Sequence, residues 1–151
     1  MNFLYEAFVT LEPETGEPNM ILRPIIPVRI FGQSAFGHYA ALVDTGADNT
    51  IFPKRIADDL GIELQAGLGP DATAFGGQTI SLLFGDIELE LEEQQERVRW
   101  KARVQFYDFA DPEDEMLILG HAGFLDYFSA MFDGEQGLLS LTPNSTLPQM
   151  L

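Results

Sequence analysis

Apolar and polar residues alternate along much of this chain, and the alternation is strictest after residue 85. Residues 86–92 alternate acidic with apolar side chains, and residues 97–103 alternate basic with apolar ones. Folding the two segments about residues 93–96 pairs opposite charges: Asp86 with Arg103, Glu88 with Lys101, Glu90 with Arg99 and Glu92 with Arg97. The apolar positions that then share the core side are Ile87, Leu89, Leu91, Val98 and Trp100. The pattern predicts an antiparallel hairpin with one charged and one buried face.

The rest of the chain predicts further strands and little helix. Strands are expected over residues 3–11, 21–31, 38–43, 115–119, 130–133 and 138–141, with a hairpin over 72–84 that turns at Gly76-Gly77. Pro24 and Pro27 place the second strand at a sheet edge or junction, because proline cannot donate to a ladder. Pro53 can open a short helix that ends at Gly61, and residues 121–128 allow further helical turns. The expected fold is mainly β with one or two short helices.

Composition and charge argue against some of the functions that this chain could have. The 151 residues suit a single domain, and 8 basic against 24 acidic residues give a net charge of −16. This charge argues against nucleic acid or an anionic membrane as the partner. Half of the basic residues lie in residues 97–103 around Trp100, which suggests either a nucleic-acid stripe or a self-neutralised hairpin face. The acidic partner strand favours the second interpretation.

Several kinds of chemistry lack the residues they need. The absence of cysteine excludes disulfides, thiolate metal sites and thiol catalysis. His38 and His121 form no metal-binding helix motif, and no nucleotide-binding glycine loop or serine-nucleophile elbow occurs. The acidic loop over residues 108–115 does not have calcium-loop spacing, so a solvated turn is favoured. We expect no metal and no cofactor. Without a targeting signal or a membrane span, a cytoplasmic protein is expected.

Carboxylate chemistry remains, and Asp44 is the carboxylate that stands out. It follows the apolar run Ala40-Ala41-Leu42-Val43, and Gly46 two residues later permits a tight turn and a close substrate approach. Burial at a strand end opposes ionisation, which tunes a carboxyl group for acid–base work. The structural alternative is an Asx-turn, in which the Asp44 side chain bonds nearby backbone amides.

Four segments in order resemble the retropepsin-like aspartic proteases, the single-lobe class that includes retroviral proteases. Residues 41–50, Ala-Leu-Val-Asp-Thr-Gly-Ala-Asp-Asn-Thr, resemble the active-site loop of this family, and residues 23–30 resemble the strand that leads to it. Phe75-Gly76-Gly77 is similar to the glycine-rich flap tip. Ile118-Leu119-Gly120 resembles the hydrophobic-hydrophobic-glycine motif, and residues 121–128 follow where the family has a helix.

The resemblance implies a closed-barrel β lobe that hydrolyses peptide bonds with two aspartates. The chain has one Asp-Thr-Gly, so the pair requires Asp44 from each of two copies, in a homodimer that acts on a peptide or protein. By the same resemblance, the catalytic set is Asp44, Thr45 and Gly46, and the substrate-binding set is Ala47, Asp48, Phe75, Gly76 and Gly77. The expected division is an extension over residues 1–19, a protease domain over 20–141 and a tail over 142–151.

Departures from the family leave alternatives open. Retroviral members have an arginine at the position of His121, so we expect His121 to contact Asp48 here. The chain can instead be a catalytically silent peptide- or partner-binding module, or residues 1–19 can be a removable pro-segment or lid. Two copies together carry −32, so acid conditions are expected to favour dimerisation and activity.

Overall fold

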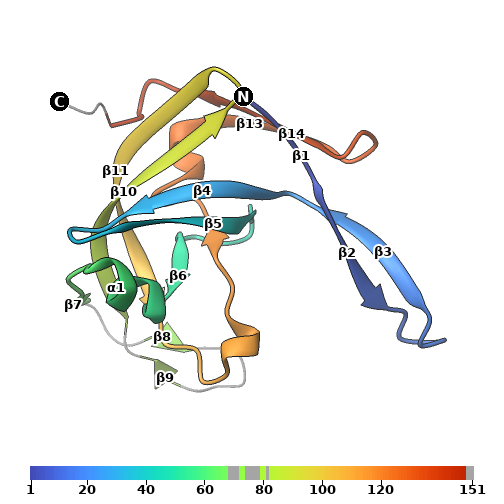
Figure 1. The fold of residues 1–151 in the computed structure, drawn as a ribbon, viewed down its shortest axis with the longest axis horizontal. Coiled ribbons are helices and arrows are strands. Elements are labelled where there is room, and N and C mark those ends of the chain that lie inside the picture. The colour runs from blue at the N-terminus through green and yellow to red at the C-terminus, as the bar shows by residue number, and fades with distance from the viewer. Residues whose placement is uncertain (68–71, 74–78, 81, 149–151) are drawn as a thin grey trace.

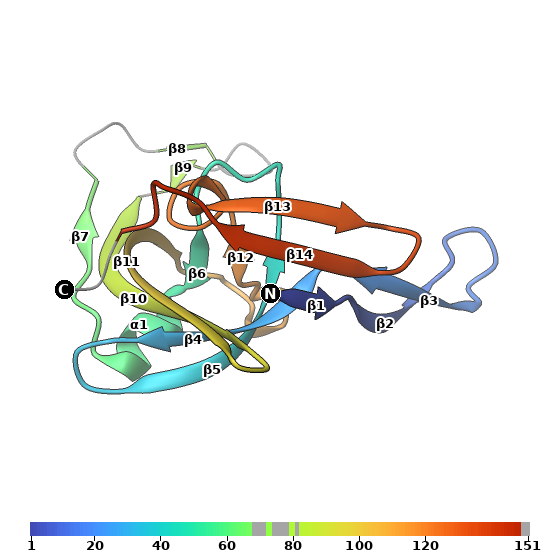
Figure 2. The same ribbon diagram turned by 90° about the horizontal axis from the view of Figure 1, so that it is seen from above.

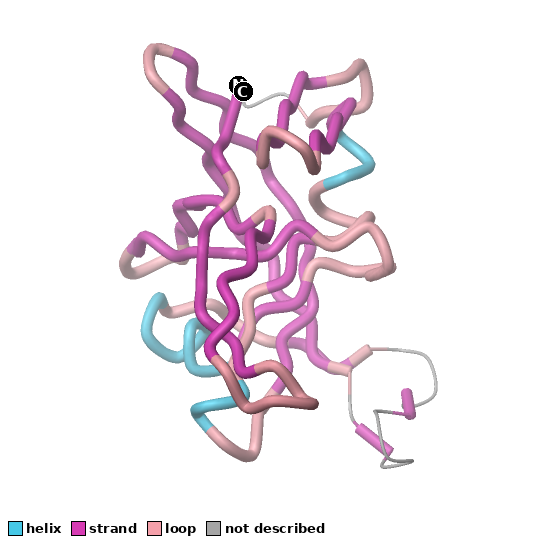
Figure 3. The backbone as a smooth tube through the Cα atoms, turned by 90° about the vertical axis from the view of Figure 1, so that its right-hand side faces the viewer, coloured by secondary structure: helices cyan, strands magenta, loops and turns pink. Residues whose placement is uncertain are grey.

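Six strands close into a barrel in the computed structural model, which describes residues 1–67, 72–73, 79–80 and 82–148 (Figure 1). Their order is β11-β6-β12-β5-β4-β10, and pairing of β10 with β11 closes the ring. The barrel strands are β4 (Ile25–Phe31), β5 (Phe36–Val43), β6 (Ile51–Pro53), β10 (Leu83–Glu93), β11 (Glu96–Tyr107) and β12 (Ile118–Leu119). The expectation of a mainly β, closed-barrel fold is thus confirmed, and Figure 3 shows how little of the described backbone is helical.

Strands β10 and β11 form the hairpin expected from the alternating charges. All four predicted cross-strand positions are in register: Asp86 with Arg103, Glu88 with Lys101, Glu90 with Arg99 and Glu92 with Arg97. The first and last of these also form ion pairs, at 3.3 and 3.1 Å. Arg99 instead bonds Glu88 across the diagonal. The facing Glu90 is buried and bonds Arg29 of the neighbouring β4 at 2.6 Å.

The core of the barrel is centred on Trp100, which is fully buried. Its indole Nε1 donates a hydrogen bond to the Gly123 carbonyl at 2.9 Å, and its ring packs against Phe124 and Phe128. Trp100 therefore ties β11 to the segment after β12, which contains the 3-10 turn η2 (Leu125–Tyr127). A second 3-10 turn, η1 (Pro112–Asp114), lies in the acidic loop before β12.

The helix α1 (Lys54–Leu60) forms where proline and glycine predict it. Pro53 is its N-cap, and Gly61 ends it in the left-handed conformation at φ 70°. Arg55 of this helix bonds the Glu115 carboxylate, with Nη2 to Oε2 at 2.8 Å. That hydrogen bond, together with the carboxylate charge, raises the pKa of Arg55. The pair holds the loop before β12 against α1.

A second sheet packs over one end of the barrel and contains the first and the last strand of the described chain (Figure 2). Its order is β1-β14-β13, with β1 (Asn2–Leu4), β13 (Phe128–Asp133) and β14 (Leu138–Pro143). Phe3 is buried in the core, and the amino group of Met1 donates to the Leu141 carbonyl at 3.0 Å. Residues before 20 thus contribute to the packed core as well as to an extension.

Strands β2 (Glu6–Leu11) and β3 (Pro18–Arg23) form a hairpin that projects from the barrel (Figures 1 and 2). We call it the arm. The predicted division between residues 19 and 20 falls inside β3, and Pro24 separates β3 from β4, so the expectation of a sheet junction is met.

Short strands complete the described chain. Strand β7 (Gln65–Ala66) pairs with the start of β10. Strands β8 (Ala72–Thr73) and β9 (Thr79–Ile80) pair with each other inside the predicted hairpin range. Their register places Thr73 opposite Thr79, whereas a two-residue turn at Gly76-Gly77 would place it opposite Ile80. The expected flap tip, Phe75-Gly76-Gly77, lies outside the described residues. No helix in the described ranges is long and apolar enough to cross a membrane.

Candidate active site

Asp44 directly follows β5 at the point where β12 runs alongside it. The two strands are parallel, with Leu42 beside Ile118 and Val43 beside Leu119. The backbone N–H of Asp44 donates to the Leu119 carbonyl at 3.0 Å, which continues the ladder for one more residue. Strand β12 also pairs with β6. The loop that contains Asp44 therefore connects β5 to β6, and both of these strands pair with β12. The loop therefore starts from a fixed backbone position.

One carboxylate oxygen of Asp44 is fixed by the loop itself. The Gly46 N–H donates to Oδ1 at 2.8 Å, in an Asx-type turn. A Cβ on residue 46 would lie 3.2 Å from that oxygen, so glycine permits this close approach. Among the described residues, no donor bonds Oδ2, and the side chain is half-buried. The structural alternative, an Asx-turn, is thus present, and it leaves the second oxygen available for chemistry.

Residues 44–50 interlock with residues 119–122 through backbone hydrogen bonds. The His121 N–H donates to the Ala47 carbonyl at 3.0 Å, and the Ala122 N–H donates to the Asp48 carbonyl at 2.9 Å. In return, the Thr50 N–H donates to the Ala122 carbonyl at 3.0 Å. Bonds in both directions make the two segments one unit. This unit, residues 44–50 with 119–122, is called the locked loop below.

Gly120 lies at the tightest point of the locked loop. A Cβ on this residue would collide with the carbonyl oxygen of Asn49 and would lie 2.7 Å from that of Ala47. Its backbone φ is not positive, so space alone requires glycine here. The glycine of the hydrophobic-hydrophobic-glycine motif thus has a steric role beside Asp44.

The Thr50 side chain makes a hydrogen bond within the locked loop that the sequence pattern did not predict. It is fully buried, and its Oγ1 accepts a hydrogen bond from the Gly120 N–H at 3.2 Å. The signal in the sequence is only a threonine at the end of a polar loop, which does not distinguish a buried hydroxyl from an exposed one.

Thr50→Val is expected to lower the free energy of unfolding by about 1–2 kcal/mol, because it leaves the buried Gly120 N–H without an acceptor at nearly unchanged volume. Urea denaturation measures the difference. Thr142→Val makes the same change at an exposed position of β14 and is expected to stay within about 0.5 kcal/mol of the wild type. Equal stability of the two variants would contradict the role of Thr50.

His121 does not make the contact with Asp48 that the resemblance led us to expect. Its Nε2 bonds the Thr45 carbonyl at 2.8 Å, and its Nδ1 lies 3.9 Å from the Asp126 carboxylate. No ion pair between His121 and Asp48 occurs in the described part of the chain, although their backbones are adjacent. The imidazole of His121 thus bonds a backbone carbonyl of the Asp44 loop, and the carboxylate beside its other nitrogen belongs to Asp126 of η2.

The other predicted site residues divide into two groups. Thr45, Gly46 and Asp48 are exposed and Ala47 is half-buried, all on the same loop as Asp44. Phe75, Gly76 and Gly77 lie outside the described residues, so their position near Asp44 stays a prediction. Within the described ranges, no three acidic or histidine side chains are grouped to hold a metal ion.

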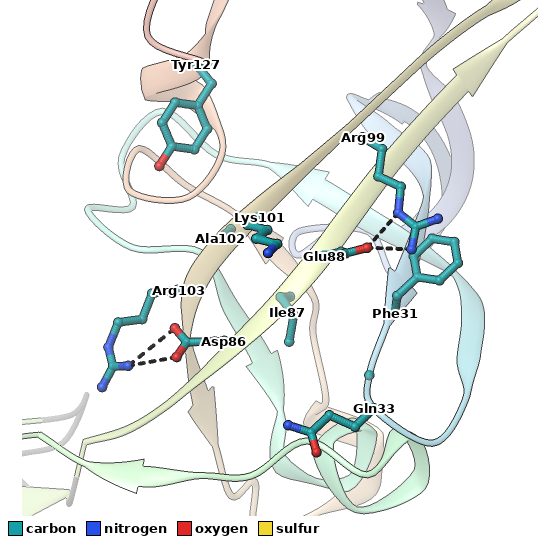
Figure 4. A pocket seen from close by; sticks show the side chains of 11 residues that line it. Phe31, Gln33, Asp86, Ile87, Glu88, Arg99, Lys101, Ala102, Arg103 and Tyr127 are labelled. Atoms are coloured by element: carbon teal, nitrogen blue, oxygen red, sulfur yellow. Dashed lines mark hydrogen bonds and ion pairs between the residues drawn. The ribbon is translucent and has the colours of Figure 1, made fainter. Parts of the chain in front are cut away.

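A surface cavity of about 650 Å³ lies beside the β10–β11 hairpin (Figure 4), and Asp44 is not among the residues that line it. Its lining includes Phe31, Arg99, Lys101 and Tyr127. Phe31 lies at the β4–β5 turn, whereas Asp44 follows the far end of β5, about 25 Å away along eight residues of strand. Arg99 stacks on the Phe31 ring and bonds Glu88, so its charge is neutralised within the fold. This arrangement agrees with the interpretation of residues 97–103 as part of a self-neutralised hairpin face.

Comparison with known proteins finds similarity to solved structures and none at the level of sequence families. No protein-family model and no curated protein matches the chain. Among solved structures, its fold is similar to that of EIAV protease complexed with the inhibitor HBY-793, at 20% sequence identity and a TM-score of 0.45. The similarity covers 75% of this chain and 88% of that one. At this identity the likeness concerns the fold alone.

Proposed function

We propose that the chain is an aspartic endopeptidase that acts as a homodimer and hydrolyses peptide bonds with one Asp44 from each copy. The observation that carries the proposal is the Asp44 carboxylate, on a loop locked to β12. Its Oδ1 is fixed by the Gly46 N–H, and its Oδ2 accepts no hydrogen bond from the described residues. A fixed carboxylate at a strand end has the preorganisation that acid–base catalysis requires.

Two such carboxylates about 3 Å apart cannot both ionise, so they share one proton. The ionised member takes a proton from a water molecule, whose oxygen attacks the substrate carbonyl carbon. The protonated member donates to the carbonyl oxygen and stabilises the charge that develops there. The apparent pKa values belong to the pair and not to either copy. A single chain supplies half of this site.

The neighbours of Asp44 are assigned supporting roles in this proposal. Thr45 is exposed at the loop tip, where it can bond the second copy, and Gly46 orients the catalytic carboxylate. Ala47 and Asp48 are assigned contacts with the bound peptide, and the segment that contains Phe75, Gly76 and Gly77 is assigned the role of covering the peptide and excluding water. The substrate class is a peptide or protein in an extended conformation.

A peptide-library cleavage assay across pH tests the function. The expected result is cleavage at internal peptide bonds, with a rate per chain that rises with protein concentration as dimers form. Absence of cleavage at every pH by a demonstrated dimer would contradict the proposal and favour the silent binding module.

Acidification from pH 7 towards pH 5 is expected to raise the dimer fraction. Carboxylates with ordinary pKa values near 4 begin to take up protons in this range, so the repulsion between two chains of −16 each decreases. Sedimentation velocity at fixed concentration and ionic strength measures the fraction. A dimer fraction that is constant or falls over this range would contradict the electrostatic argument.

A further inference from the structure

The arm has one face made only of apolar side chains. Residues paired directly across β2 and β3 share a face: Ala7 with Leu22, Val9 with Met20, and Leu11 with Pro18. All six are exposed, and Val9, Leu11 and Met20 are about two-thirds exposed, at 67%, 65% and 69%. The opposite face is mixed, because it also contains charged and amide side chains. We call the all-apolar side the arm face.

The arm face continues a row that is buried elsewhere in the fold. Along β4, every second residue faces the core, and Ile26, Val28 and Ile30 are at most 2% exposed. The same alternation, read back across Pro24 into β3, reaches Leu22, Met20 and Pro18, which are exposed. The barrel thus covers one half of this row, whereas in the other half Leu22 is 47% exposed and Met20 is 69% exposed. An isolated two-stranded hairpin is marginal in water, so a cover over this face would stabilise it.

The base of the arm is fixed beside Asp44. The Pro24 carbonyl accepts a hydrogen bond from the Val43 N–H at 2.9 Å, one residue before Asp44. On its other side, the Tyr5 N–H donates to the Gly137 carbonyl at 2.7 Å, which joins the arm to the β13–β14 turn. The arm therefore leaves the barrel beside the end of β5, which Asp44 follows. Figure 1 shows the arm projecting from this end of β4 and β5. A molecule that faces Asp44 closely therefore lies near the base of the arm.

We propose that the arm is a dimerisation device whose apolar face packs on a second copy of this chain. This inference rests on the proposed function, which requires the second copy's Asp44 at this end of the barrel. Charge supports the same occupant: two chains of −16 repel each other, so a contact between copies needs a surface without acidic residues, and the arm face is such a surface. Soluble monomers seldom expose a continuous apolar patch of this kind without a partner.

Two-fold symmetry makes the contact reciprocal. Each arm packs on the other copy, so one interface contains two arm faces and two copies of the Asp44 loop. Because burial of apolar area stabilises this dimer, added salt is expected to preserve or strengthen it by screening the repulsion.

The double variant V9T/M20Q tests the inference with the full chain. It makes one directly paired rung of the arm face polar while retaining similar side-chain sizes. The matched control, T10S/N19Q, changes the next rung, on the opposite face. Sedimentation equilibrium is expected to show a dimer dissociation constant raised roughly tenfold or more for V9T/M20Q and unchanged for the control. Fluorescence of the single, buried Trp100 reports whether each barrel is folded.

Peptide cleavage, measured alongside, separates the two proposals. Cleavage by V9T/M20Q that is weak at low protein concentration and recovers at high concentration supports both. If V9T/M20Q weakens the dimer but the wild-type dimer cleaves no peptide, the role of the arm in dimerisation is supported and the proposed function is contradicted. If V9T/M20Q dimerises as tightly as the wild type, the proposed role of the arm is contradicted and the proposed function is unaffected. A wild type that stays monomeric up to high concentration, or an arm that binds only a different protein, overturns the inference.

Discussion

Asp44→Asn is expected to reduce peptide cleavage by roughly 10⁴-fold or more, the scale seen when a protease loses an essential catalytic group. An amide can neither accept the proton of the attacking water nor share a proton with a partner carboxylate. The fold is expected to survive, because the amide oxygen of asparagine can still accept the hydrogen bond that the Gly46 N–H now donates to Oδ1. The initial rate of peptide cleavage at matched dimer concentration is the measurement.

Asp108→Asn is the control for this substitution. It makes the same carboxylate-to-amide change on an exposed residue of the acidic loop, and it also alters the net charge by one unit. Cleavage by this variant is expected to equal that of the wild type. Equal cleavage by the Asp44→Asn and Asp108→Asn variants would eliminate the proposed mechanism.

Mixed dimers make the test sharper. Under random pairing with an equal amount of the Asp44→Asn chain, about half of the wild-type chains lie in dimers with a single aspartate. Activity per wild-type chain is then expected to fall to about half. If each chain acted alone, addition of the variant would leave the activity unchanged.

Sequence reasoning succeeded where a pattern is local. The register of residues 86–103 followed from alternating charges, because a shift by one residue would move every apolar side chain to the charged face. Pro53 and Gly61 likewise determined the ends of α1 through their own backbone preferences. In each case, the residues that decide the structure are neighbours in the chain.

Contacts between distant segments were harder to predict. Arg99 bonds Glu88 and not the facing Glu90, because Arg29 from another strand already holds Glu90. The same applies around Asp44. The tripeptide Asp44-Thr45-Gly46 was recognisable, whereas the bonds of Thr50 and His121 depend on how two loops 70 or more residues apart interlock. The pairing of His121 with Asp48 was wrong for this reason.

Gly120→Ala is expected to be the most damaging small substitution near the site. The added methyl group has to displace the backbone carbonyl oxygens of Asn49 and Ala47, and the Ala47 carbonyl is held by a hydrogen bond from the His121 N–H. Overpacking against backbone is expected to lower the free energy of unfolding by about 2–4 kcal/mol. Urea denaturation measures this loss.

Activity in the folded fraction of Gly120→Ala shows whether the locked loop matters for chemistry. A shift of the loop by about 1 Å is expected to reduce cleavage roughly 10²-fold at matched dimer concentration, because the two carboxylates lose their alignment. Gly134→Ala is the matched control, since a Cβ there meets nothing within 4 Å and the backbone φ is not positive. If Gly120→Ala is as stable and active as Gly134→Ala, the Asp44 loop does not depend on its packing against β12, and its preorganisation must have another source.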